Sequence, residues 1–244
     1  MNRSRLRVRS VLAVFALAMM FLSLVPTAAA NAAERVKAFP FVNNYATTRF
    51  KHQTTVSIAG YQVRSFGAGE IVSPDRIRVW STNEATGEIT NVIQIGGSAY
   101  QQEGDKPWEK VAGVGAYSSA PMAEQLNQIQ EIADSISYLG VEKVGDRDTS
   151  HYQAKISGET IKRLLGDAFS DLPKSSQDVL KNATLTYDFW IGADSFVYQQ
   201  NITLQTASYE IDGQSVPGLD YGVLMTFYDI NDPNISVTAP EGVK

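Results

Sequence analysis

The chain of 244 residues contains no cysteine and only two histidines, so several kinds of site are missing from the start. Without cysteine there is no disulfide framework, no thiolate metal site and no lipobox cysteine to carry a lipid anchor. Metal-binding helix motifs with paired histidines are absent as well. Because a eukaryotic secreted domain of this size usually carries disulfides, the composition favours a bacterial origin for the chain if it is exported.

Long hydrophobic runs are scarce, and the clearest one covers residues 11–25. Four arginines and no acidic residue precede it: Arg3, Arg5, Arg7 and Arg9. An alanine-rich stretch follows, and this order is typical of a signal peptide cleaved after Ala30 or Ala32. The run is shorter than the roughly 20 residues of a membrane-spanning helix. We therefore expect a signal peptide over residues 1–33 and a single domain over residues 34–244, with a retained membrane anchor as the alternative.

Basic residues are the minority, with 21 Lys and Arg against 26 Asp and Glu in the whole chain. Removal of the expected leader takes four arginines and no acids, which leaves 17 basic residues in the mature protein. An acidic protein is a poor partner for nucleic acid and for anionic lipid headgroups. Contact with lipid is therefore expected through apolar surface or a cavity. We expect the protein in the periplasm, cell envelope or extracellular space, without a lipid anchor.

Most of the mature sequence alternates between apolar and polar residues in short segments separated by turn residues. In residues 76–80, Ile77 and Val79 face one way and their neighbours the other, while Gly96 and Gly97 suit a tight hairpin. This spacing predicts an antiparallel sheet with one buried face. Further strands are expected at residues 50–58, 67–72, 88–95, 98–102, 141–144, 150–156, 184–191, 196–206, 222–230 and 235–237.

The apolar period changes in the middle of the chain, where apolar residues recur at steps of three and four. They are Met122, Leu126, Ile129, Ile132, Ile136 and Leu139. Ser119 is placed to cap this helix and Gly140 to end it. Residues 161–169 predict a second helix, and residues 175–178 the capped start of a third.

Groups suited to catalysis are sparse. His52 and His151 each stand alone in a strand-like segment, which favours exposed polar residues over a general base or metal ligand, because a base needs a positioned partner. The three tryptophans allow a sugar-stacking face, although aromatic residues in strands usually pack in a core. Two acidic pairs in turns have fewer ligands than a calcium loop needs: Asp146 with Asp148, and Asp229 with Asp232. The sequence predicts no catalytic residue, no metal site and no cofactor.

Several short motifs follow one another in a distinctive order. They are GEIVSPDRI at 69–77, IGGSAY at 95–100, KPW at 106–108, YDFWI at 187–191 and FYDINDP at 227–233. The order and spacing resemble the LppX/LprG group of mycobacterial lipoproteins and, more distantly, the LolA/LolB lipoprotein carriers. The resemblance covers about residues 50–240. The clearest departure is the missing lipobox cysteine, which affects tethering to a membrane and leaves the fold untouched.

The resemblance implies an α+β fold, namely a curved antiparallel β-sheet (half-barrel) with helices covering the concave face. It also implies extracytoplasmic binding or transfer of a lipid, glycolipid or lipoprotein acyl chain, by a protein that is not an enzyme. The implied partners are this acylated ligand and an envelope membrane protein. Residues expected to line the cavity are Val56, Ile71, Val79, Ile129, Ile136, Leu165, Phe189, Leu204 and Phe227. Because the same residues suit a close-packed core, lining and filling both stay open.

Two other classes of function stay open. One is a sensor or interaction domain on the same fold, like the amino-terminal half of RseB-type envelope-stress regulators, whose output is the binding of another protein. The other is an enzyme, for example one that acts on glycans, which requires a cleft with converging carboxylates.

Overall fold

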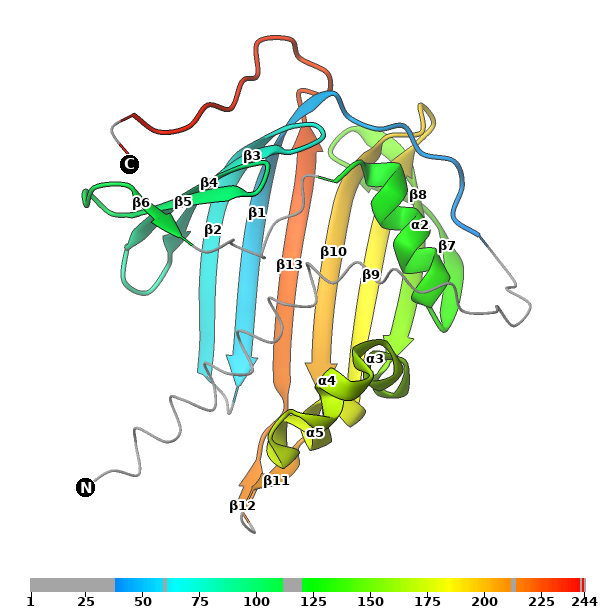
Figure 1. Cartoon of the computed structure of the whole chain (residues 1–244). Helices are drawn as coiled ribbons and strands as arrows, with labels where there is room; N and C mark the ends of the chain where they lie inside the picture. The colour runs from blue at the N-terminus through cyan, green and yellow to red at the C-terminus, as the bar shows by residue number, and fades with distance from the viewer. Residues whose placement is uncertain (1–37, 59–60, 112–119, 212–213, 242, 244) are drawn as a thin grey trace.

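The computed structural model describes residues 38–241 and 243, apart from 59–60, 112–119 and 212–213, and the expected leader lies outside this part. Its main element is an antiparallel sheet of 11 strands (Figure 1). The strands in spatial order are β6 (Glu109–Val111), β5 (Ser98–Glu103), β4 (Ile89–Ile95), β3 (Arg76–Asn83), β2 (Tyr61–Val72), β1 (Thr47–Ile58), β13 (Leu219–Tyr228), β10 (Val197–Thr206), β9 (Ala183–Gly192), β8 (Arg147–Ser157) and β7 (Ser135–Val144). The outer strands β6 and β7 do not pair with each other, so the sheet is open. A separate hairpin joins β11 (Tyr209–Ile211) to β12 (Gln214–Val216).

The two halves of the sheet are joined by strands from opposite ends of the chain. Strands β1 to β6 follow one another as a meander, and β7 to β10 form a second one. Strand β13 lies between β1 and β10, and its pairing with β1 runs from Arg49 opposite Tyr228 to Ile58 opposite Leu219. The first and last strands therefore lie side by side in the middle of the sheet, where they hold the halves together.

Alternation of side chains gives the sheet one apolar face, as the sequence predicts. In β3, Ile77 and Val79 are buried while Arg76 and Arg78 are exposed, and much of β2, β10 and β13 follows the same period of two. We call the side that carries Val79 and Phe189 the apolar face, and the other side the opposite face. The predicted curved antiparallel sheet accompanied by a few helices is confirmed.

Glycines in β2 leave room for aromatic rings that extend from β1. Phe50 is paired with Gly69, and His52 with Gly67. A Cβ atom at Gly69 would lie 2.3 Å from Cζ of Phe50 and 2.5 Å from the carbonyl oxygen of Arg78, which is closer than atoms pack in proteins. Glycine is therefore required there, because a ring from the neighbouring strand occupies the space of its missing side chain.

The helices lie over the half of the sheet formed by β8 to β10. Figure 1 shows α2 (Met122–Ile132) in front of β8 and β9, with α3 (Gly158–Leu165), α4 (Asp167–Ser170) and α5 (Lys174–Lys181) at one end of β9 and β10. Among the described helices, none lies over β2 to β5 in this arrangement. The expected covering of the concave face by helices is thus found on one half of the sheet.

The first helix is shorter than the sequence predicts. It ends at Ile132, and Ala133 already has extended backbone angles. Ile136 and Tyr138 instead pair with β8, opposite Ala154 and Tyr152, as part of β7. The apolar spacing of this segment fits a helix and a strand equally well over a few residues, and pairing with β8 decides the outcome.

Two further predictions for the second half of the chain, a strand and a helix cap, were wrong. Residues 235–237 are not a strand, although Ile235 and Val237 are buried and the carbonyl of Val237 accepts a hydrogen bond from Arg76. The helix α5 begins after Pro173 without a side-chain cap, so the predicted cap at residues 175–178 is not used. In the part of the chain that the structure describes, no helix combines the length and the hydropathy needed to cross a bilayer.

Candidate functional site

The apolar face is the candidate site because one continuous cluster of buried side chains extends across it. Its members come from seven neighbouring strands, β3 to β8 in spatial order, from the helices α2 to α5 and from the segment before β1. The rings of Phe50, Tyr45 and Phe227 pack within this cluster at centroid distances of 5.3 to 6.2 Å. Burial raises the pKa of Tyr187 and of Tyr221, on the same face, to about 12. These two tyrosines are therefore shielded from solvent among the apolar side chains of this face.

Seven of the nine residues proposed as cavity lining belong to this cluster, and the other two pack against it. The seven are buried: Val56, Ile71, Val79, Ile129, Phe189, Leu204 and Phe227. Ile136 and Leu165 are partly buried and pack against the others. Ile136 reaches the cluster from β7 rather than from a helix, as the shorter α2 requires. That these nine residues line a cavity, and do not merely fill a core, stays a prediction.

An extended segment, residues 38–46, brings further groups to the apolar face beside α2. The ring of Phe39 meets that of Phe189 edge to face at 5.4 Å, and the backbone N–H of Phe39 donates to Gln130 of α2. Asn44 accepts a hydrogen bond from the backbone N–H of Ala123 in the first turn of α2. The expected cap Ser119 lies outside the described residues, and Pro121 gives α2 no side-chain cap. The side-chain oxygen of Asn44, 79 residues earlier in the chain, therefore accepts a hydrogen bond from a backbone N–H that has no partner within the helix.

Two polar side chains interrupt the apolar face in its centre. His52 on β1 is 4% exposed and Gln200 on β10 is 6% exposed. Nε2 of His52 lies 3.4 Å from the carbonyl oxygen of Trp80, and burial lowers the pKa of this histidine although that contact opposes the shift. The expectation that His52 is an exposed residue was wrong, because β1 lies in the middle of the sheet and its even-numbered residues face the cluster.

His151 was also expected to be exposed, but it is buried on the opposite face in a polar cluster. Its Nδ1 lies 3.0 Å from Oε1 of Glu142, and its Nε2 lies 3.0 Å from Oδ1 of Asp188. Gln153 donates to the same oxygen of Asp188, and the ring stacks on Trp190 at 4.2 Å. The positioned carboxylate partners that the sequence did not reveal are therefore present.

A β-bulge places Glu142 in this cluster. The register between β7 and β8 shifts between Tyr138 and Gly140, which leaves Leu139 as an extra residue. Without it, Glu142 would share the apolar face with Tyr138. The hydrogen bond from the indole N–H of Trp190 and the contact with His151 lower the pKa of Glu142. The Leu139-Gly140 pair, with Gly140 at φ 117°, is the sequence signal for this bulge.

The His151 cluster is suited to holding strands together rather than to catalysis. Its carboxylates bind the imidazole from two sides, so neither ring nitrogen is directed at an open space where a substrate would react. Within the described residues, no group of three or more histidine, aspartate or glutamate side chains could hold a metal ion. Strands β7, β8 and β9 each contribute one member of the His151–Glu142–Asp188 set.

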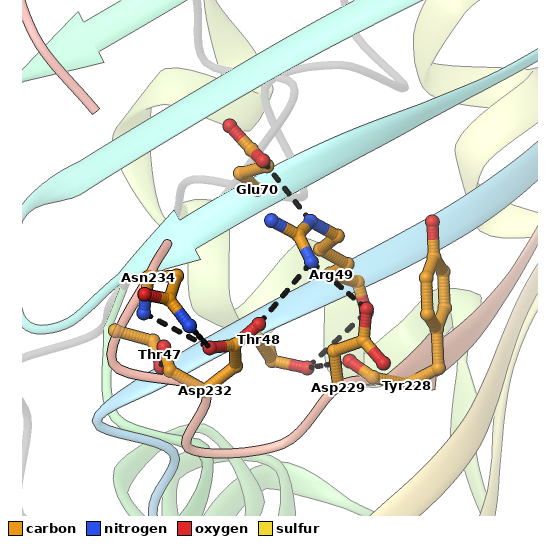
Figure 2. A network of polar contacts seen from close by, with 8 residues as sticks. All are labelled: Thr47, Thr48, Arg49, Glu70, Tyr228, Asp229, Asp232 and Asn234. Carbon is orange, nitrogen blue, oxygen red and sulfur yellow. Dashed lines mark hydrogen bonds and ion pairs between the residues drawn. The ribbon is translucent and has the colours of Figure 1, made fainter. Parts of the chain in front are cut away.

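A second polar network ties the end of the chain to the sheet (Figure 2). Arg49 binds Glu70 at 3.1 Å, Asp229 at 2.9 Å and Asp232 at 3.4 Å. The backbone N–H of Asn234, followed by the charge of Arg49, lowers the pKa of Asp232. Asp229 and Asp232, which the sequence analysis considered as calcium ligands, thus share an arginine. The two aspartates are therefore part of an ion-pair network that holds the turn against the sheet.

Replacement of Arg49 by leucine is expected to loosen the turn at residues 229–234. The turn would keep its backbone bond from Asn231 to Thr47 but lose the cation shared by three carboxylates. We therefore expect faster hydrogen exchange in this turn without global unfolding, measured by mass spectrometry. Arg78→Leu, on the same face, is the control. Equal exchange in the two variants would contradict the assignment.

A surface pocket in the described part of the chain lies away from the nine residues proposed as cavity lining. It is a shallow, open hollow between two hairpin loops, lined by residues 87–89 and 103–106. None of the nine proposed lining residues borders it.

Comparisons with known proteins were made for sequence and for structure. No protein-family model matches the chain, and none of the curated proteins matches its sequence. Solved structures that match include the lipoprotein LppX of Mycobacterium tuberculosis, LprF of Mycobacterium bovis and a LolA superfamily protein of Nitrosomonas europaea. These are the kinds of protein that the order of the sequence motifs predicts.

The similarity to these structures is broad but low. LppX has 11% identity and a TM-score of 0.37, and LprF has 9% and 0.40; each match covers 80% of this chain and 90% of the other. The LolA superfamily protein has 8% identity and a TM-score of 0.32, over 82% of this chain and 90% of its own. Similarity at this level concerns the arrangement of the strands and carries no ligand over to this chain.

Proposed function

We propose that this protein binds the acyl chain of a lipid, glycolipid or lipoprotein on the apolar face of its sheet, outside the cytoplasm. The observation that supports the proposal is the extent of that face. One apolar cluster spans seven strands, while the described helices lie over three of them. Partly buried apolar side chains such as Met225 and Ile136 remain on this face. An acyl chain matches its chemistry.

The energetics favour exchange of the acyl chain over extraction from a membrane. Transfer of a chain of roughly 16 carbons from water to an apolar site gains on the order of 10 kcal/mol, at ~0.8 kcal/mol per methylene. The same chain in a bilayer is already out of water, so almost none of this gain applies. The ligand is therefore best received from a partner with a comparable apolar site, which fits a carrier that works with an envelope membrane protein.

Two substitutions at neighbouring positions of β13 test the proposal. Met225 lies on the apolar face and Leu224 on the opposite face, and both are partly buried. We expect Met225→Glu to weaken binding of a fluorescent acyl ester probe by at least about tenfold, because it places a carboxylate among apolar side chains. Leu224→Glu should leave probe binding unchanged. Circular dichroism checks that both variants fold.

Native mass spectrometry of the protein from its own host supplies the second measurement. Co-purified acyl species in near one-to-one ratio would support the proposal. A protein that arrives empty and also fails to bind the probe would overturn it, and so would equal probe binding by folded Met225→Glu and Leu224→Glu variants.

A protein-binding role is the second candidate, favoured by the edge strand β7. Its outer backbone groups are unpaired in the sheet, and Tyr138, Leu139 and Val141 on it are 44%, 49% and 63% exposed. An edge of this kind can accept a strand from a partner. Loss of a stoichiometric partner on Val141→Pro, with probe binding retained, would favour this role. Retention of the partner by that variant would count against it.

A further inference from the structure

Gln200 is a largely buried residue on the apolar face, and its amide, which still reaches solvent, makes no side-chain hydrogen bond within the described chain. It is 6% exposed, and its strand neighbours on the same face are Phe189 on β9 and Met225 on β13. Buried polar side chains in folded proteins nearly always have a hydrogen-bond partner. An accessible amide without a partner in the protein, in the centre of an apolar face proposed to bind a ligand, is therefore a candidate for contact with that ligand.

His52 lies in the same row of the sheet. Met225 pairs with Gln200 on one side and with His52 on the other, so two strand spacings, about 10 Å, separate the two polar residues. Burial lowers the pKa of His52, which favours the uncharged imidazole. The polar part of the apolar face is thus formed by neutral groups.

No basic residue of the paired strands β1 to β3, β8 to β10 and β13 shares this face. The register places their lysines and arginines on the opposite face: Arg49, Lys51, Arg64, Arg76, Arg78, Arg147 and Lys155. A phosphate or a free carboxylate buried beside Gln200 would therefore meet no positive partner from these strands, which is costly in an apolar environment. A neutral carbonyl needs only one hydrogen-bond donor, and the amide of glutamine supplies it.

We infer that Gln200 donates a hydrogen bond to the ester or amide carbonyl that joins the acyl chain to its head, so that the ligand is an acyl ester or acyl amide and not a free fatty acid. This inference rests on the proposed function. The acyl chain then contacts the apolar side chains around Gln200, and the linkage stays neutral. The ester and the amide share the carbonyl that Gln200 recognises.

The inference is tested by competition against a bound fluorescent acyl probe at pH 8. The three competing ligands have matched chain length: hexadecane, methyl palmitate and palmitate. We expect the ester to compete best in the wild-type protein. Gln200→Leu should weaken the ester by about two- to tenfold, the usual worth of one neutral hydrogen bond, and leave hexadecane unchanged. The control Gln199→Leu, on the opposite face of the same strand, should change neither.

The melting temperature of the empty Gln200→Leu variant separates recognition from structure. If the amide has no partner in the protein, its replacement by leucine keeps or raises the melting temperature. A large drop would show that the amide is structural and overturn the inference, as would equal competition by ester and hexadecane in both proteins. Failure of all three ligands to compete, together with failure of the probe to bind, would overturn the proposed function itself.

Discussion

Replacement of His151 by leucine is expected to lower the free energy of unfolding by about 1 to 3 kcal/mol, the usual cost of leaving a buried polar group without its hydrogen-bond partner. The imidazole lies between Asp188 and Glu142, and leucine leaves both carboxylates without it. The side chain of Asp188 is only 10% exposed and would retain Gln153 as its partner, whereas that of Glu142 is 50% exposed and can turn to solvent. Most of the loss therefore comes from Asp188. Denaturation by urea measures it.

A second substitution shows whether the loss arises from the uncompensated charge. In the His151→Leu background, Asp188→Asn removes the charge and keeps a side chain that Gln153 can still contact. The double variant should therefore be more stable than His151→Leu alone, with a coupling free energy of about 1 to 3 kcal/mol. Additive effects would mean that loss of stacking on Trp190 explains the destabilisation instead.

The strands were predictable because their information is local. Alternation in β3 assigns Ile77 and Val79 to one face, and Gly96 with φ 54° forms the hairpin that its dipeptide predicts. The register of β1 with β13 joins residues about 170 positions apart and has no local signal. The seven buried members of the candidate site were therefore predictable as apolar-face residues, while their meeting in one cluster depends on that long-range pairing.

Errors arose where contacts distant in sequence decide the conformation. Ile136 continues the helical spacing of α2, yet the backbone N–H of Asp134 bonds to Lys155 and the segment joins β8 as a strand. The environment of His151 depends on the bulge at Leu139, which changes the face on which Glu142 lies. Gln200 gave no signal at all, because a glutamine in a strand is ordinary until its burial is known.

The glycine at position 69 is expected to be irreplaceable even by alanine. The added Cβ would meet the ring of Phe50 at 2.3 Å and the backbone oxygen of Arg78 at 2.5 Å, and the oxygen belongs to a paired strand that cannot move alone. Gly69→Ala should therefore cost more than about 3 kcal/mol, the upper end of ordinary overpacking. Thermal and urea unfolding measure the loss, and an insoluble variant would be the extreme case of the same effect.

A control and a double variant identify the cause of this loss. Gly97 has open space around it, so Gly97→Ala should change stability by less than about 0.5 kcal/mol. Phe50→Ala combined with Gly69→Ala removes the ring but not the oxygen of Arg78, so the pair should remain unstable. If the double variant instead recovers the stability of Phe50→Ala alone, the ring is the obstacle and β2 can move away from β3. In that event the ring of Phe50, and not the close approach of β2 and β3, is what requires glycine at position 69.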